Sequence, residues 1–114
     1  MMVKKYSTKS LSEIAGGDKD FMLIIAKTFL EKIPPDLKAM QEAIGNNNRE
    51  LAYQFAHKMK PNLEMFGLNL GKEITSIESW TKNLKNKSTI ETHLKNVVAT
   101  VERVFIELKQ DFKL

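Results

Sequence analysis

The chain has 114 residues and a mass of 13.1 kDa, which suits one compact domain spanning residues 1–114. It contains no cysteine, which excludes disulfides, thiolate metal sites, iron–sulfur clusters and cysteine nucleophiles. Eighteen Lys and Arg against fourteen Asp and Glu give a net charge of +4, a mild excess that favours acidic partners and leaves nucleic acid possible.

The sequence offers no candidate for a membrane anchor. The longest uninterrupted apolar run, residues 21–26, is far shorter than the roughly 20 residues that a spanning helix needs. Residues 1–6 read Met-Met-Val-Lys-Lys-Tyr and then turn polar, without the apolar stretch of a signal peptide. We therefore expect a cytoplasmic protein with no membrane contact.

Helical periodicity dominates the first half of the chain. A short helix is expected over residues 10–15. A second helix begins after the N-cap Asp18 and runs to about residue 33, where Pro34-Pro35 interrupts it. A further helical segment follows and stops at Gly45. The apolar residues that define the faces of these segments are Leu11, Ile14, Ala15, Phe21, Ile25, Phe29, Leu37, Met40 and Ile44.

The second half of the chain continues in the same way. Asn47 or Asn48 caps a helix that runs to about residue 63, and a helix over about residues 70–85 follows. Ser88 or Thr89 caps the last helix, which carries a long apolar stripe. The inward-facing residues expected here are Leu51, Phe55, Met59, Leu63, Leu70, Ile74, Ile77, Leu84, Leu94, Val97, Val98, Val101, Val104, Phe105, Leu108 and Phe112.

These segments predict an all-α fold. Four main helices of about 13 to 24 residues, joined by short turns, favour an antiparallel up-and-down four-helix bundle with its core at about residues 18–113. The short helix at residues 10–15 would lie across the bundle or at its end. No Glu-x-x-His spacing typical of di-metal bundles occurs. We expect a monomer with no metal site and no cofactor of its own.

His57 is the outstanding candidate for chemistry because its place on the helix directs it away from the core. It lies two residues from both Phe55 and Met59, hence roughly 160–200° from each around the helix. Lys60 at i+3 and Tyr53 at i−4 share its exposed face. A neutral imidazole is a nucleophile, and a nearby ammonium neutralises charge on a phosphoryl group. An ordinary surface histidine is the alternative interpretation.

Residues 56–68 resemble the signature of histidine phosphotransfer (HPt) domains of bacterial two-component phosphorelays. In that family the His is followed by any residue, a hydrophobe, Lys and a small residue, with Gly ten positions after the His. His57, Met59, Lys60 and Gly67 occupy those places, and the resemblance gives Met59 and Gly67 structural roles. The other residues that resemble the family are Phe66, Ile77-Glu78 and residues 11–29.

The resemblance implies a phosphorelay carrier. A response-regulator receiver domain would carry the phosphoryl group on an aspartate and bind the Mg²⁺, and a hybrid sensor histidine kinase would belong to the same relay. His57 would accept the group through Nε2 and pass it to a second receiver. Docking would use Tyr53, Gln54, Lys58, Lys60 and Pro61, with help from Leu11 and Ile14.

Such a carrier is a transfer intermediate and not an enzyme that phosphorylates itself, since the chain has no kinase ATP motif. A free-standing carrier and a domain excised from a hybrid kinase both fit the ends of the sequence.

Two departures from the HPt pattern keep other functions open. Pro61 stands where Gly is usual, and Asn62 replaces a frequent Ser or Ala. Glu50 and Glu64 share the face of His57 and are mildly unfavourable beside a phosphohistidine. One alternative is a helical module that binds a receiver or another signalling protein without phosphotransfer. Another is a basic nucleic-acid binder, which is disfavoured because only two of the eighteen basic residues are Arg.

Overall fold

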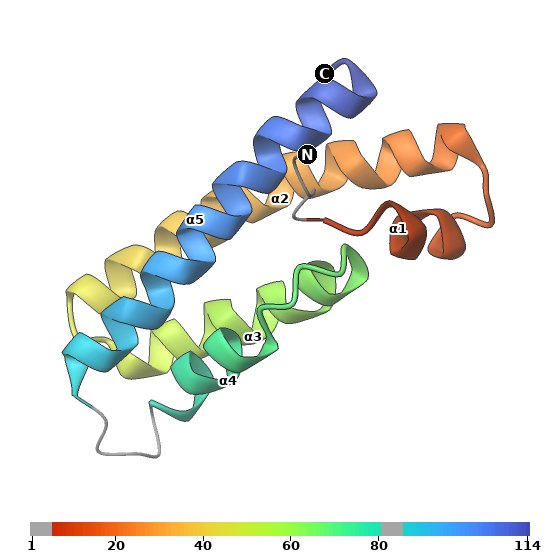
Figure 1. Ribbon diagram of the computed structural model, residues 1–114. Helices are drawn as coiled ribbons and strands as arrows, with labels where there is room; N and C mark the ends of the chain where they lie inside the picture. The colour runs from red at the N-terminus through yellow and green to blue at the C-terminus, as the bar shows by residue number, and fades with distance from the viewer. Residues whose placement is uncertain (1–5, 81–85) are drawn as a thin grey trace.

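The computed structural model describes residues 6–80 and 86–114, and these residues form an all-helical structure without strands (Figure 1). Within these ranges, no helix combines the length and apolar character needed to cross a bilayer. The five helices are α1 (Thr8–Ile14), α2 (Lys19–Gly45), α3 (Arg49–Met65), α4 (Gly71–Ser79) and α5 (Lys87–Phe112).

The two longest helices, α2 and α5, lie side by side, and α3 and α4 complete the core (Figure 1). Helix α3 packs against α2, and α4 packs against both α3 and α5. Helix α1 is a short segment that contacts α2 and α3. The buried apolar side chains of all five helices form one hydrophobic cluster, so α4 is held firmly against α3 by shared burial.

Polar side chains fix where four of the helices begin. Asp18 caps α2, as predicted, Asn48, one of the two expected candidates, caps α3, and Ser7 caps α1. The expected cap of the last helix at Ser88 or Thr89 is wrong. Asn86 is the cap, and its side-chain oxygen accepts a hydrogen bond from the Thr89 backbone N–H at 2.9 Å.

The predicted interruption at Pro34-Pro35 is also wrong, because α2 runs through both prolines without a break. A proline inside a helix costs about 3 kcal/mol, since it lacks an N–H and crowds the carbonyl four residues earlier. Its fixed φ nevertheless suits a helix. Ile33 and Leu37 are buried on either side of the pair, and this tertiary packing offsets the local cost. Pro61 likewise lies inside α3, which continues to Met65.

Most of the predicted apolar faces are buried or partly buried, including the whole stripe of α5. Phe21 is an exception, with 46% of its surface exposed. On α3 the fully buried line passes through Ala52 and Ala56, whereas Leu51 and Phe55 pack only at the margin of the core. The helix predicted over about residues 70–85 is observed only as α4, which ends at Ser79 with Trp80 as its C-cap. Leu84, expected on its inner face, lies outside the described residues.

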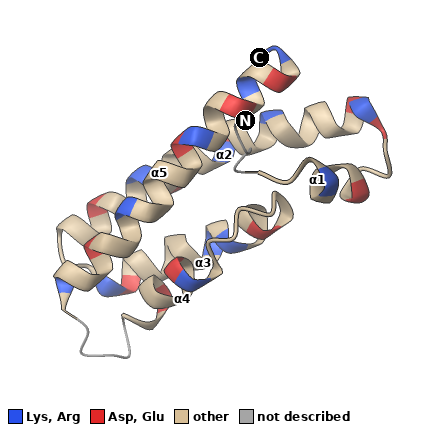
Figure 2. Ribbon diagram, viewed as in Figure 1, with Lys and Arg blue, Asp and Glu red and all other residues tan. Residues whose placement is uncertain are grey.

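Charged residues of both signs are interleaved along the described helices (Figure 2). Several are paired within the molecule, for example Lys58 with Asp36 at 3.1 Å and Arg103 with Glu107 at 3.2 Å. The ribbon view shows no helix on which basic residues alone gather (Figure 2). The charge along these helices is therefore mixed in sign.

Candidate functional site

His57 lies on the middle of α3 with 66% of its side chain exposed, which confirms the orientation predicted from the helical periodicity. Ala56 and Met59, which lie in the same turn of α3 but face the core, are completely buried. Met59 therefore anchors the helix in the core, as the resemblance implied. The imidazole is left on the outer surface of a helix whose position is fixed.

Helix α4 contributes the residue that binds the imidazole. Nδ1 of His57 lies 2.9 Å from Oε2 of Glu78, near the end of α4. A carboxylate only accepts hydrogen bonds, so Nδ1 must carry the proton that it donates to Glu78. In the neutral ring this arrangement leaves the lone pair on Nε2, for which the described residues provide no hydrogen bond.

Lys60 approaches the same carboxylate from the next turn of α3. Its Nζ lies 3.4 Å from Oε1 of Glu78, and its side chain is about one-third exposed (35%). One carboxylate thus joins the imidazole and the ammonium through its two oxygens. The pair holds Lys60 beside His57, where its positive charge reaches the surface around the ring.

Tyr53, one turn before His57, lies nearly parallel to the imidazole. The two ring centroids are 5.6 Å apart and the ring planes differ by 7°, which is a stacked arrangement. Tyr53 itself is half-buried. The predicted common face of Tyr53, His57 and Lys60 is therefore observed.

The remaining residues predicted for docking have different environments. Gln54, Lys58 and Pro61 are exposed on α3. The Lys58 ammonium is directed toward α2, where it pairs with the largely buried Asp36. On α1, Ile14 is 46% exposed, but Leu11 is completely buried. The expectation that Leu11 contributes to docking is wrong, because Leu11 packs into the core under α1.

Gly67 has a structural role that explains its place in the motif. It follows α3 with a φ of +64°, a backbone conformation that residues with a side chain rarely adopt. A Cβ built there would lie 2.7 Å from the Cβ of Ser7. The neighbouring Phe66 carbonyl accepts a hydrogen bond from the Ser7 N–H at 2.7 Å. Gly67 therefore permits the close approach between the end of α3 and the segment before α1.

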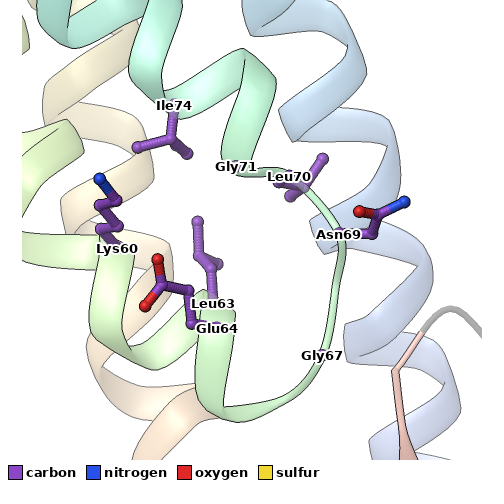
Figure 3. A pocket seen from close by; sticks show the side chains of 8 residues that line it. All are labelled: Lys60, Leu63, Glu64, Gly67, Asn69, Leu70, Gly71 and Ile74. Atoms are coloured by element: carbon purple, nitrogen blue, oxygen red, sulfur yellow. The ribbon is translucent and has the colours of Figure 1, made fainter.

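A cavity of about 370 Å³ opens between α3 and α4 on the Lys60 side of the site (Figure 3). Apolar side chains of Leu63, Leu70 and Ile74 line it, and Lys60 and Glu64 from α3 carry its charged groups (Figure 3). The cavity makes the surface beside His57, Lys60 and Glu78 concave, a feature that the sequence pattern did not predict.

Glu78 is the site residue that sequence reasoning missed. Its only signal was the Ile77-Glu78 pair within the family resemblance, which gave no reason to place it at His57. Lys60 and His57 share one helix, so periodicity relates them, but Glu78 reaches them only through the packing of α4 on α3.

Among the described residues, no cluster of His, Asp and Glu has the arrangement of a metal site.

Comparison of this chain with protein-family models, with curated proteins and with solved structures yields no match. The function of this chain is therefore inferred from the residues of the site and their geometry.

Proposed function

We propose that the chain is a histidine phosphotransfer domain that carries a phosphoryl group on His57. In this proposal α2 to α5 are an antiparallel up-and-down four-helix bundle, and α1 is the short extra N-terminal helix. The observation that carries the proposal is the exposed imidazole with Nδ1 bound to Glu78, which leaves Nε2 as the nucleophilic nitrogen. Its setting on a rigid helix beside Lys60 fits group transfer between proteins.

The transfer step needs few groups from this chain. A receiver domain presents an aspartyl phosphate, and the Nε2 lone pair attacks phosphorus in line. The bond between phosphorus and the aspartyl oxygen breaks as the N–P bond forms, and the aspartate leaves as a carboxylate. The Nδ1 proton stays on the ring. Glu78, 2.9 Å from Nδ1, stabilises the positive charge that the imidazole acquires.

Lys60 supplies charge neutralisation. The phosphoryl oxygens are negatively charged, and a lysine ammonium is a compact charge on a flexible stem with three donors. At 3.4 Å, its pair with Glu78 is at the long end of hydrogen-bond distance. Lys60 can therefore turn from Glu78 toward a phosphoryl group on Nε2 while it stays within the same cluster.

The partners in this proposal are response-regulator receivers and a hybrid sensor histidine kinase, in the cytoplasm, with a monomeric carrier. The receiver supplies the Mg²⁺. Its concave active site closes over the outward imidazole, and the exposed α3 residues Gln54, Lys58 and Pro61 meet its rim. Pro61 offers a compact, rigid contact at i+4 from His57. The reverse reaction passes the group to a second receiver.

The direct test is transfer of radiolabel from a ³²P-phosphorylated receiver in the presence of Mg²⁺. Wild type should take up label, and His57→Gln should take up none. His57→Gln should fold normally because the side chain is exposed. His93→Gln is the matched control, since His93 is the second of the two histidines and should not be needed. Equal labelling of wild type and His57→Gln would rule the proposal out.

The binding-module alternative gives a different result in the same experiment. The receiver would bind tightly to the wild-type chain, and no label would move. Pro61 is the feature on which this alternative rests, because it is the exposed departure from the HPt pattern nearest to His57.

A further inference from the structure

We propose that Tyr53 is a positioning residue for phosphoryl transfer: by stacking on the His57 imidazole, it holds the ring in the plane from which Nε2 meets phosphorus. This inference rests on the proposed function. The family pattern quoted above begins at the His and assigns no role to the position four residues before it.

The rings of Tyr53 and His57 form a parallel pair on the surface of α3. The rings are nearly parallel, 7° apart in plane, with their centroids separated by 5.6 Å. Both residues lie on α3, one turn apart, so the helix backbone itself sets the separation of the two rings. Tyr53 is half-buried whereas the imidazole is 66% exposed. The more buried ring therefore supports the more exposed one.

The hydrogen bond to Glu78 is not sufficient to fix the imidazole. It fixes Nδ1 at 2.9 Å from the carboxylate, but coupled rotations about χ1 and χ2 of His57 still let the ring plane swing while that distance is kept. The flat face of Tyr53 restricts this swing. In-line attack requires the reacting atoms to be aligned within about 3–3.5 Å, and small misplacements slow such reactions greatly. Together, Glu78 and Tyr53 define both the tautomer and the plane of the nucleophile.

A docking role for Tyr53 predicts different kinetics. If Tyr53 only contacted the receiver, its loss would raise the receiver concentration that gives half-maximal transfer and would leave the maximal rate unchanged. A positioning residue acts after docking. Its loss lowers the maximal rate and leaves the half-maximal concentration unchanged.

The experiment compares wild type, Tyr53→Ala and Tyr53→Phe in rapid-quench transfer from a phosphorylated receiver over a range of receiver concentrations. For Tyr53→Ala we expect the maximal rate to fall about tenfold, with an unchanged half-maximal concentration. Tyr53→Phe keeps the stacking ring, so it should behave as wild type. An unchanged maximal rate in Tyr53→Ala, or a Tyr53→Phe variant as slow as Tyr53→Ala, would overturn the proposal.

A second measurement needs no phosphoryl donor. In NMR spectra of the free protein, the carbon-bound ring protons of His57 should show ring-current shifts from Tyr53 in wild type and Tyr53→Phe. Tyr53→Ala should lose those shifts and show averaging of the His57 side-chain rotamers. Identical His57 rotamers in all three proteins would contradict the positioning role. If wild type accepts no phosphoryl group, the proposed function fails and this inference fails with it, and the NMR result then describes a purely structural stack.

Discussion

At His57, a single carboxylate sets the chemistry of two neighbouring groups. Glu78 accepts from Nδ1 of the imidazole and pairs with the Lys60 ammonium. Because a carboxylate cannot donate a hydrogen bond, it selects the ring tautomer with hydrogen on Nδ1. The nitrogen with the lone pair is then Nε2, so the free protein already holds the tautomer that the proposed transfer requires.

Removal of this carboxylate should therefore change the tautomer. For Glu78→Ala we expect the neutral imidazole to shift toward the form with hydrogen on Nε2, which lacks a lone pair at the attacking atom. Nitrogen-15 NMR of the ring nitrogens at mildly alkaline pH measures the two forms. Transfer should slow several-fold in parallel. A tautomer ratio equal to that of wild type would show that Glu78 does not control the ring.

Lys60 should matter for rate and not for stability. Lys60→Ala should slow transfer about 10- to 100-fold, because the phosphoryl oxygens lose a neutralising charge. Its pair with Glu78 is partly exposed, and such pairs contribute about 0–1 kcal/mol to stability. Thermal unfolding should therefore be nearly unchanged. Lys95→Ala, an exposed lysine on α5, is the control for loss of one positive charge. A transfer rate in Lys60→Ala that equals that of Lys95→Ala would contradict this role.

The sequence predicted the α3 part of the site and missed the α4 part for one reason. The spacing of His57 from Phe55 and Met59 fixes its direction on a helix, whatever the helix packs against. Glu78 is 21 residues away, across a turn whose geometry no periodicity describes. Leu11 shows the converse error, since the docking role that the resemblance implied for it is excluded by its complete burial in the core.

Between α3 and α4, the backbone at Gly67 determines how the site is assembled. The positive φ turns the chain out of α3, and the space beside Gly67 is occupied by Ser7. This turn brings the chain back so that α4 packs on α3 with Glu78 facing His57. A motif glycine ten residues from the histidine therefore acts through the shape of the connection.

Gly67→Ala should destabilise the protein. The left-handed φ costs roughly 1–2 kcal/mol for a residue with a side chain, and the 2.7 Å approach to Ser7 adds a steric cost. Gly45→Ala is the matched control. Gly45 has no neighbour within 4 Å of a built Cβ and lies at the last position of α2. In urea unfolding, the free energy of unfolding should fall for Gly67→Ala. For Gly45→Ala it should change little or rise. Equal stability of the two variants would contradict the account of this turn.

Helix boundaries show where local rules are sufficient. Asp18, and either Asn47 or Asn48, were predicted as caps because a side-chain oxygen next to an apolar-periodic segment satisfies the free N–H groups of the first turn, and Asp18 and Asn48 are the observed caps. The break at Pro34-Pro35 was predicted from an equally local rule and was wrong. Burial of Ile33 and Leu37 is a tertiary effect that exceeds the local penalty, and a single sequence does not display it.

Across the whole molecule, Tyr6 joins the N-terminal segment to the end of α5. Its hydroxyl hydrogen-bonds the carboxylate of Asp111, and its ring lies 6.4 Å from that of Phe66 after α3. The side chain is 4% exposed. Burial first, and then the hydrogen bond to Asp111, raises the pKa of Tyr6 well above its ordinary value of about 10.

This raised pKa predicts a loss of stability at alkaline pH. Above about pH 10 the unfolded chain loses the Tyr6 proton while the folded chain retains it. The folded state then binds more protons than the unfolded state, so the free energy of unfolding falls as pH rises. Below about pH 10, the contribution of Tyr6 to the free energy of unfolding is fully present.

The measurement is urea unfolding between pH 9 and 11.5 for wild type, Tyr6→Phe and Tyr53→Phe. Tyr6→Phe should be less stable at pH 9 because it loses the hydrogen bond, but its stability should decline less steeply. Tyr53→Phe, which removes a tyrosine hydroxyl elsewhere, is the control and should follow the wild-type slope. If the free energy of unfolding of Tyr6→Phe falls with pH as steeply as that of wild type, Tyr6 does not cause the loss of stability at alkaline pH.

The arrangement of the helices was predictable only in part. The all-helical class and most core residues follow from apolar periodicity. The contacts between the two ends of the chain could not be predicted from periodicity. Tyr6 and Asp111 are 105 residues apart, and their pairing depends on the complete fold. The same holds for the cavity beside Lys60, whose lining comes from α3, α4 and the loop between them.

The central claim is that Nε2 of His57 receives the phosphoryl group. The most direct measurement is phosphorus–proton correlation NMR of the wild-type chain after incubation with a phosphorylated receiver and Mg²⁺. A phosphorus atom on Nε2 is three bonds from both carbon-bound ring protons, so we predict couplings to both protons of His57. Coupling to only one of these protons, attachment to another residue, or the absence of any N–P signal would contradict the account.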